Sequence, residues 1–199
     1  MEDTEQAHRG VKIGGAMKST DLVFVDTETT GLDARKHEII EIALVRIRQD
    51  WTAGEKPAFA EIDSWSAKIK PENIAGADPA ALRINGYTAG AWEDAISLRD
   101  ALTLFSEKTA GAIMVAHNVA FDAEFIDTNL SMLGIPNKMH YHRLDTISMA
   151  YAKLHGIPEV TRFSLGELCK YFGITNISAH SAESDARADF EIFKRLLEL

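Results

Sequence analysis

The stretch VFVDTETTGLD, residues 23–33, leads from a short apolar segment directly into two carboxylates, Asp26 and Glu28. Residues two apart on a β-strand face the same way, so both side chains are expected to project from one face near the strand's C-terminal end. Two partly buried carboxylates are costly unless a partner stabilises their charged form, and no lysine or arginine directly adjoins them. A divalent cation is the natural partner, whereas a solvated strand end would explain the pair without one.

The sequence around this stretch predicts a sheet made of consecutive strands. Apolar and β-branched residues dominate segments 22–28 and 38–48, which a glycine-containing turn separates, and both are typical of central strands. A third strand is expected within residues 61–70, after the turn residues of QDWTAGEKP. We therefore expect the first three strands to form an antiparallel meander.

After these strands the hydrophobic period becomes helical. Segment 86–111 is expected to form a helix that ends at Gly111, because its apolar residues recur at mostly helical spacings: Trp92, Ile96, Leu98, Leu102 and Phe105. Residues 112–118, AIMVAHN, predict a buried strand, and residues 120–134 predict the helix that follows it. Three further helices are expected at residues 144–156, 164–173 and 181–199.

Composition predicts one globular domain. The chain has 199 residues, of which 46% are apolar and 26% charged. Residues 1–19 mix charges with glycines and are expected to be a flexible leader to a domain at residues 20–199. The single cysteine, Cys169, can form no internal disulfide, and no apolar run reaches the roughly 18 residues that span a bilayer. These features favour a cytoplasmic protein.

The net charge of −9 argues against a broad basic surface that wraps duplex DNA. It does not exclude a small nucleic-acid site. If acidic residues gather around two divalent ions, the charge of the working protein becomes −9 + 4 = −5, and the sign of the local field can reverse.

Two more carboxylates stand at predicted helix starts, where the helix dipole favours negative charge. Asp122 lies in the first turn after the 112–118 strand, and Asp185 lies near the start of the last helix. His180, five residues before Asp185, is expected on the loop just before a Ser181 cap. Each of these residues, taken alone, has a structural explanation.

Three segments resemble, in order along the chain, the three exonuclease motifs of the DEDDh 3′-to-5′ exonucleases, also called DnaQ-like. The segments are VDTETTGL, AHNVAFDAEF and HSAESDA. The resemblance covers the chain from Leu22 to its last residue. Within that family, DTETTGL, IIEIALV, VAHNVAFD and SLGELCKYFGI are most similar to the proofreading epsilon subunits of bacterial DNA polymerase III. Ribonuclease T and oligoribonuclease are more distant relatives.

The resemblance implies an α/β, ribonuclease H-like fold, with a mixed five-stranded sheet and helices on both faces. It also implies that Asp26, Glu28, Asp122 and Asp185 bind two divalent ions, Mg²⁺ or Mn²⁺, and that His180 is the general base. The histidine five residues before the last aspartate assigns the DEDDh subclass.

The matching family residues hold the terminal nucleotide through the turn after Glu28. Leu32 and Phe121 are candidates for base contact, although core packing explains Phe121 equally well. Asn118 is expected either to cap the helix or to bind the strand end. The candidate substrate-binding residues are Thr27, Thr29, Gly31, Leu32, Asn118 and Phe121.

A zinc site is a weaker alternative for the other histidines. His140 and His142 could face the same way together with Asp145, but no cysteine or further histidine completes the set. We therefore expect Asp145 to cap a helix, and His117 to pack behind the Asp122 turn.

The leading hypothesis is a two-metal-ion 3′-to-5′ exonuclease that acts on single-stranded or frayed DNA and releases nucleoside 5′-monophosphates. The first alternative is an RNA-processing 3′-to-5′ exoribonuclease similar to ribonuclease T. The second is a non-catalytic nucleic-acid-binding subunit, which would not need the complete set of acids and base. A polymerase as a non-covalent partner and the oligomeric state are open.

Overall fold

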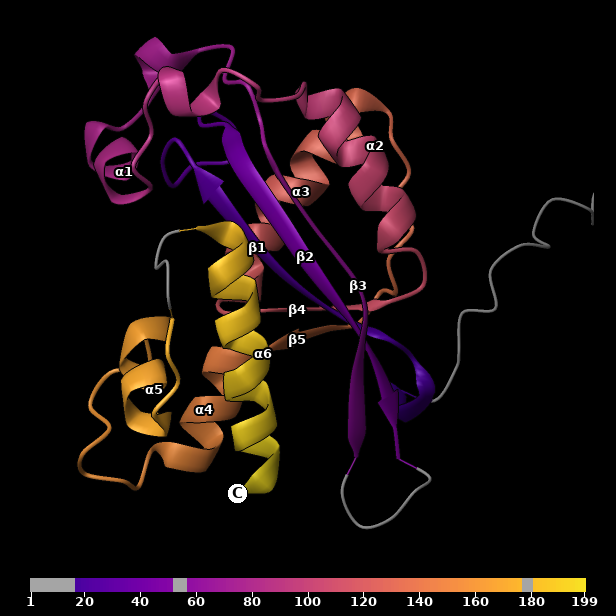
Figure 1. Cartoon of the computed structure of the whole chain (residues 1–199), viewed down its shortest axis with the longest axis vertical. Helices are drawn as coiled ribbons and strands as arrows, with labels where there is room; N and C mark the ends of the chain where they lie inside the picture. Colours follow the sequence, from indigo (N-terminus) through magenta and orange to yellow (C-terminus); the bar gives the residue numbers. More distant parts are fainter. Residues whose placement is uncertain (1–16, 52–56, 177–180) are drawn as a thin grey trace, which may run out of the picture.

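Five strands form one mixed sheet in the order β3-β2-β1-β4-β5, in a computed structural model that describes residues 17–51, 57–176 and 181–199 (Figure 1). The strands are β1 (Leu22–Thr29), β2 (Ile39–Asp50), β3 (Ala58–Lys68), β4 (Ile113–Ala116) and β5 (Arg143–Asp145). Strands β1, β2 and β3 pair antiparallel, whereas β4 pairs parallel to β1 and β5 parallel to β4. The predicted meander and the predicted ribonuclease H-like fold class are confirmed.

Six α-helices accompany the sheet in the described ranges. They are α1 (Pro79–Ile84), α2 (Leu98–Lys108), α3 (Val119–Leu133), α4 (Thr146–Leu154), α5 (Leu165–Phe172) and α6 (Ala182–Glu198). Three short 3-10 turns add to these: η1 (Met17–Ser19), η2 (Ile74–Gly76) and η3 (Gly90–Trp92). In Figure 1, α6 crosses in front of the sheet, while α2 and α3 lie behind it.

The alternation of side chains along β1 divides the core into two layers. Val23 and Val25 pack with α2 and α3, whereas Leu22 and Phe24 pack with Phe193 of α6. All of these residues except Phe193, at 4%, are at most 1% exposed. By the same alternation, Asp26 and Glu28 continue the row of Leu22 and Phe24 toward α6. The two carboxylates therefore lie on the side of the sheet that α6 covers.

The helix predicted over residues 86–111 is wrong in its first half, because α2 begins only at Leu98. The Ser97 hydroxyl caps α2 by accepting a hydrogen bond from the Asp100 amide, 3.1 Å away. Trp92 belongs to η3 and donates from Nε1 to the Ile40 carbonyl, and Ile96 forms a bridge to Ile69. These apolar side chains face the core from an irregular segment, so their helical spacing is incidental.

The predicted division into a leader and a domain at residue 20 falls partly outside the described residues. Residues 1–16 lie outside them, and Met17–Ser19 form η1, whose Met17 carbonyl accepts a hydrogen bond from Gln49 Nε2. In the described part of the chain, none of the helices is both long and apolar enough to cross a membrane. Cys169 is buried in α5.

Candidate metal centre

Three carboxylates from two elements meet at the C-terminal end of β1. Asp26 and Glu28 come from β1, and Asp185 comes from the first turn of α6. One carboxylate oxygen from each of the three lies within 4.8 Å of the other two. We call Asp26, Glu28 and Asp185 the acid trio. Asp185 thus joins Asp26 and Glu28, which lie at least 157 positions earlier in the sequence, because α6 packs across β1.

Small side chains let α6 approach the sheet closely. Ala182 and Ala186 are fully buried, and Ala186 contacts the apolar layer on this face of the sheet. The first helical hydrogen bond, from the Asp185 amide to the Ser181 carbonyl, is 3.0 Å long. The helix is therefore already regular where Asp185 projects toward β1.

Asp122, the fourth acid of the sequence prediction, lies in the first turn of α3 and is only 3% exposed. Its Oδ1 atom accepts two hydrogen bonds from Thr27, one from the amide at 2.9 Å and one from the hydroxyl at 2.7 Å. Thr27 stands between the two β1 acids, so these bonds fix Asp122 against the same strand end. Asp122 lies outside the acid trio but close enough for its charge to act on Asp26.

Burial raises the pKa values of Asp26, Glu28 and Asp122, and repulsion by neighbouring acids adds to it at Asp26 and Glu28. The pKa of Asp26 lies well above its ordinary value because the group is buried, and the charges of Asp122 and Glu28 raise it further. Burial, followed by the charge of Asp185, raises the pKa of Glu28 to about 7. Burial raises the pKa of Asp122 to about 7 even though the Thr27 hydrogen bonds favour its charged form. Such clustered shifts are typical of functional sites.

The donor set fits a hard divalent cation. All the candidate ligands are carboxylate oxygens, which suit Mg²⁺ or Mn²⁺. Oxygens that share an ion with bonds of about 2.1 Å lie at most about 4.2 Å apart, so the 4.8 Å span of the acid trio needs only small side-chain adjustments. Bound cations would offset the repulsion that raises the pKa values of Asp26 and Glu28. The acid trio and Asp122 could therefore hold metal ions.

Asn176 is a contact of the site that the sequence did not suggest. Its Nδ2 donates to Asp185 Oδ1 at 2.5 Å, and its Oδ1 accepts a hydrogen bond from the Ser184 hydroxyl at 2.6 Å. The contact fixes one oxygen of Asp185. Nothing in the sequence marks Asn176, because the bond depends on how the segment after α5 returns to α6.

The turn after Glu28 is closed by its own hydrogen bonds. The Thr29 hydroxyl donates to the Gly31 carbonyl at 2.7 Å, and the Thr30 amide donates to the Glu38 carbonyl at 2.9 Å. A Cβ atom on Gly31 would lie only 2.5 Å from the His37 ring, so the chain needs glycine here. Leu32, four residues after Glu28, is 82% exposed in this turn, so its side chain is accessible to a ligand.

Two predictions at the start of α3 have different outcomes. Phe121 is partly buried and packs on the core layer, with its ring centre 5.0 Å from that of Phe125. Of the two alternatives for Asn118, the structure contradicts the side-chain cap: its backbone is left-handed, with φ of 72°, and its side chain makes no cap hydrogen bond. Asp145 instead accepts the hydrogen bond of the Val119 amide, at 2.9 Å.

The predicted role of Asp145 as a helix cap is confirmed, because its Oδ1 accepts the Ser148 amide of α4 at 2.7 Å. His140 and His142 stack on each other with ring centres 5.0 Å apart. Among the described residues, the acid trio is the only group arranged to hold a metal, so the zinc alternative has no support in them. His117 contacts the Thr146 hydroxyl at 3.1 Å.

His180 falls in the 177–180 segment, outside the described residues. Its role as general base therefore stays a prediction from the motif. Seven other predicted site residues are described and lie at or beside the C-terminal end of β1: Asp26, Thr27, Glu28, Thr29, Gly31, Leu32 and Asp122.

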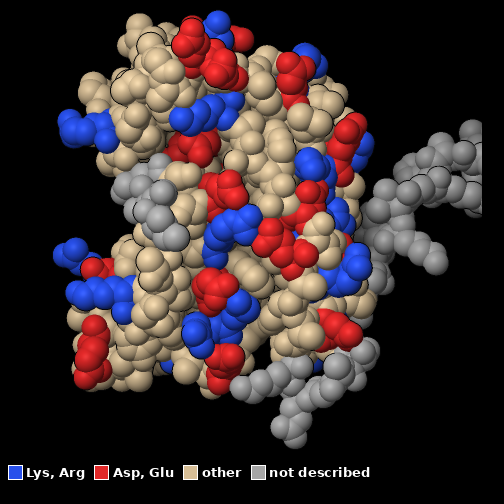
Figure 2. All heavy atoms as spheres, in the orientation of Figure 1, with Lys and Arg blue, Asp and Glu red and all other residues tan. Residues whose placement is uncertain are grey.

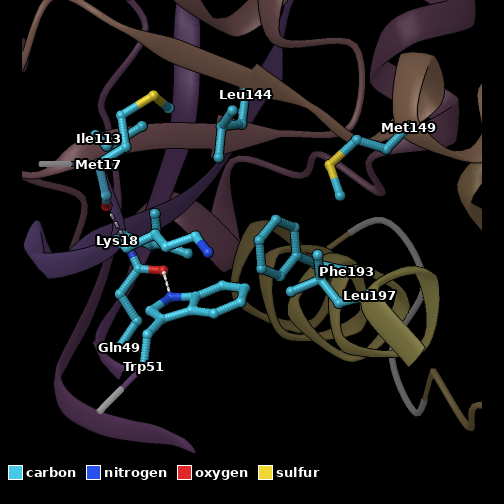
Figure 3. Close-up of a pocket in the computed structure, with 10 residues that line it drawn as sticks. Met17, Lys18, Gln49, Trp51, Ile113, Leu144, Met149, Phe193 and Leu197 are labelled. Atoms are coloured by element: carbon cyan, nitrogen blue, oxygen red, sulfur yellow. Dashed lines mark hydrogen bonds between the residues drawn. The ribbon is translucent and has the colours of Figure 1, made fainter. Parts of the chain in front are cut away.

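An apolar cavity lies at the other end of the sheet. It has a volume of about 220 Å³ and lies between the start of β1 and the C-terminal end of α6, where Trp51, Met149, Phe193 and Leu197 line it (Figure 3). It contains none of the acids discussed above. On the face that carries α6, acidic and basic side chains are interspersed, and no broad basic band crosses it (Figure 2).

Known proteins share both the sequence pattern and the fold. The RNase_T family model, described as "Exonuclease", matches residues 23–193. The DNA polymerase III subunit epsilon of Treponema pallidum is 33% identical over 172 residues, which are 86% of this chain and 74% of that protein. The PolC-type DNA polymerase III of Caldanaerobacter subterraneus is 29% identical over 89% of this chain, but only 12% of its own length is covered.

Solved structures support the fold. Exonuclease I from Methylocaldum szegediense superposes with a TM-score of 0.71 at 22% identity, over 90% of this chain and 40% of that one. E. coli exonuclease I in complex with a dT13 oligonucleotide gives a TM-score of 0.69 at 22% identity, over 89% of this chain and 41% of that one. At this identity, the likeness establishes the arrangement of the strands and helices.

Proposed function

Because the chain belongs to the exonuclease family, we propose that it removes nucleotides from the 3′ end of single-stranded or frayed DNA and releases nucleoside 5′-monophosphates. The observation that carries this proposal is the convergence of Asp26, Glu28 and Asp185, with Asp122 fixed beside them by Thr27. Burial raises the pKa values of Asp26, Glu28 and Asp122, and the acids lie where a strand end could enter.

The four acids would hold two divalent ions, Mg²⁺ or Mn²⁺. Bound there, the ions supply an activated water and stabilise charge on the attacked phosphate and on the leaving 3′-oxygen. The acid trio would provide most of the ligands, with Asp26 between the two positions. Asp122 would face the second position through its Oδ2 atom, since both hydrogen bonds from Thr27 go to Oδ1.

His180 would act as the general base that takes the proton of the attacking water. An imidazole suits this role because its reference pKa of about 6.5 lies near working pH. In the sequence it directly precedes Ser181 and α6, the helix that carries Asp185.

The turn after Glu28 would hold the terminal nucleotide. Leu32 projects from this turn, and Phe121 lies at the start of α3, so their side chains could contact the two sides of a base. Thr27, Thr29 and Gly31 would shape the site through the backbone. Asn118, whose side chain makes no cap hydrogen bond, is available for the strand end.

DNA is favoured over RNA because the two sequence relatives described above are DNA polymerase III proteins. An exoribonuclease similar to ribonuclease T is the alternative that uses the same acids. A non-catalytic binding subunit would have no need of these four acids.

The chain spans 74% of the epsilon relative and 12% of the PolC-type relative. We propose a polymerase as a non-covalent partner and a cytoplasmic location. A domain at residues 20–199 also remains part of the proposal.

The test compares matched 5′-labelled DNA and RNA oligonucleotides with a circular single strand, all in Mg²⁺. We expect the linear DNA to shorten progressively from its 3′ end while the circle survives. Asp185→Asn, which keeps the size of the side chain but removes a ligand charge, is the matched inactive control.

Each competing function has its own outcome in this experiment. Faster shortening of RNA than of DNA would favour the exoribonuclease. Early release of the label from the 5′ end, or cutting of the circle, would contradict a 3′-to-5′ exonuclease. Binding of DNA without any shortening, by wild type and control alike, would favour the binding subunit.

A further inference from the structure

Glu41 is a further carboxylate close to the acid trio, in addition to Asp122. It lies on β2 directly opposite Glu28 of β1 in the antiparallel register. Opposed residues of an antiparallel pair point to the same face, so the Glu41 side chain also points toward α6. Glu41 is 8% exposed, and its burial raises its pKa. A buried acid placed next to other acids needs a stabilising contact.

That contact is the beginning of α6. Glu41 Oε1 accepts a hydrogen bond from the Ala182 amide at 3.2 Å and lies 3.5 Å from the Ser181 hydroxyl. The first amides of a helix have no partner within the helix, and Ser181, at the cap position, makes no side-chain cap hydrogen bond. Glu41 therefore caps α6 from a neighbouring strand, with its charge at the positive end of the helix dipole.

The nearest cation across the sheet is occupied elsewhere. Lys68 of β3 pairs opposite Glu41 in the register, and its charge lowers the pKa of Glu41. However, Lys68 Nζ donates to the Ala91 carbonyl at 3.0 Å and lies 4.2 Å from the centre of the Trp92 ring. The hydrogen-bond partner of Glu41 within the described residues is thus the start of α6, not Lys68.

Asp185 follows Ala182 by three residues, which is almost one helical turn. The place where β2 holds the Ala182 amide therefore sets the distance from the Asp185 carboxylate to Asp26 and Glu28. We propose that Glu41 is a positioning residue: by capping α6 through the Ala182 amide, it holds Asp185 in register with the β1 acids. Its effect on hydrolysis rests on the proposed function, whereas its effect on the acid trio does not.

The test uses three variants of Glu41 and one control. Glu41→Ala removes the acceptor, Glu41→Asp shortens its reach by one methylene, and Glu41→Gln keeps an oxygen of the same reach without the charge. The control is Glu183→Ala. Glu183 also ties α6 to the sheet, because its Oε2 accepts a hydrogen bond from the Ser66 hydroxyl at 3.2 Å, but it does not contact the Ala182 amide.

Three measurements are made on the whole chain. Hydrogen exchange of the Ala182 amide reports the cap, and calorimetric titration with Mn²⁺ in the absence of nucleic acid reports the acid trio. The kcat and KM for a single-stranded DNA report the reaction. Cooperative thermal unfolding shows whether each variant is folded. If Glu41→Ala does not fold, the proposal is tested with Glu41→Asp.

We expect Glu41→Ala and Glu41→Asp to lose about 10- to 100-fold in Mn²⁺ affinity and in kcat, the range found when a partner of a metal ligand is removed. KM should change little, and the Ala182 amide should exchange faster. Glu41→Gln should stay within a few-fold of wild type in all three measurements, because its oxygen still accepts the amide. Glu183→Ala should keep Mn²⁺ affinity and Ala182 protection.

Three results would overturn the proposal. The first is unchanged Mn²⁺ affinity and exchange in Glu41→Ala. The second is a Glu41→Gln variant as damaged as Glu41→Ala, which would mean that charge and not the hydrogen bond matters. The third is an equal loss in Glu183→Ala. If wild type hydrolyses no DNA, the proposed function fails, but the exchange and Mn²⁺ measurements still decide the role of Glu41.

Discussion

Burial raises the pKa of Asp26, and the charges of Asp122, Glu28 and Asp185 raise it further. Asp26→Asn keeps the size of the side chain and removes its charge. We expect hydrolysis to fall below about one thousandth of the wild-type rate, since the variant loses the ligand that we propose between the two metal positions. Without metal, the variant should unfold at a higher temperature than wild type, by about 2–4 °C for each kcal/mol of relieved repulsion. Thermal unfolding in EDTA tests this, and a variant that melts at a lower temperature would contradict it.

Glu28 predicts how stability without metal depends on pH. Its pKa is 4.5 in a reference state and about 7 in the fold. Between these two values the folded protein retains a proton that the unfolded chain has released, so stability falls as pH rises through this window and remains lower above it. Urea unfolding in EDTA at about pH 5 and about pH 8 should show a loss on the order of 1–3 kcal/mol in wild type beyond that in Glu28→Gln. Equal slopes in the two proteins would mean that Glu28 ionises normally in the fold.

Thr27 controls the charge of Asp122. The hydroxyl of Thr27 donates to Asp122 Oδ1, which favours the ionised acid, while burial raises its pKa. Thr27→Val keeps the shape and the amide hydrogen bond but loses the hydroxyl, so the pKa of Asp122 should rise. Activity near pH 7 should drop by about tenfold and recover in part at higher pH. Thr27→Ser is the control that should retain the wild-type pH profile. An equal loss of activity near pH 7 in both variants would point to packing instead.

At the scale of elements, the turn between β1 and β2 depends on the close approach of Gly31 to the His37 ring. His37 Nδ1 also accepts a hydrogen bond from the Asp33 amide at 3.0 Å, which fixes the ring. Gly31→Ala should push the ring away and cost about 1–3 kcal/mol of stability, as overpacking does. In the His37→Ala background the ring is absent, so adding Gly31→Ala should cost much less stability than it does in wild type. Additive losses in a double-mutant cycle would contradict this explanation of the glycine.

Elements with a clear period were predictable from the sequence, and irregular ones were not. The alternation in β1 and the helical period of α3 and α6 follow from burial on one face. This pattern of apolar residues is visible within the sequence of each segment alone. β5 has only three residues, too few to show a period. Trp92 and Ile96 reach the core from outside a helix, so their spacing predicted the wrong element.

The candidate site shows the same division. The motifs marked Asp26, Glu28, Asp122 and Asp185, because each lies where an element begins or ends. Asn176 and Glu41 were not predicted, because their hydrogen bonds to Asp185 and Ala182 exist only after α6 has packed on the sheet. The sequence thus indicates which acids are candidates for the site, and the packing determines which residues hold them in place.

At the scale of the whole molecule, the acids and the apolar cavity occupy opposite ends of the sheet. The acids cluster where β1 ends and α6 begins, whereas Leu22 and Leu197 line the cavity where β1 begins and α6 ends. A chain with a net charge of −9 repels nucleic acid unless cations are bound at the acidic end. Metal ions are therefore expected both to stabilise this end of the fold and to let a phosphate approach it.

The most direct test of the account follows the terminal phosphodiester itself. A single DNA strand is radiolabelled only at the last phosphodiester of its 3′ end, and the protein is stripped of metal with EDTA before Mg²⁺ is added. We predict that wild type releases the label at once as a nucleoside 5′-monophosphate, only after Mg²⁺ is added, and that Asp26→Asn releases none. Release without divalent metal, release at the wild-type rate by Asp26→Asn, or label that first leaves in longer fragments would contradict a metal-dependent 3′-to-5′ exonuclease built on these acids.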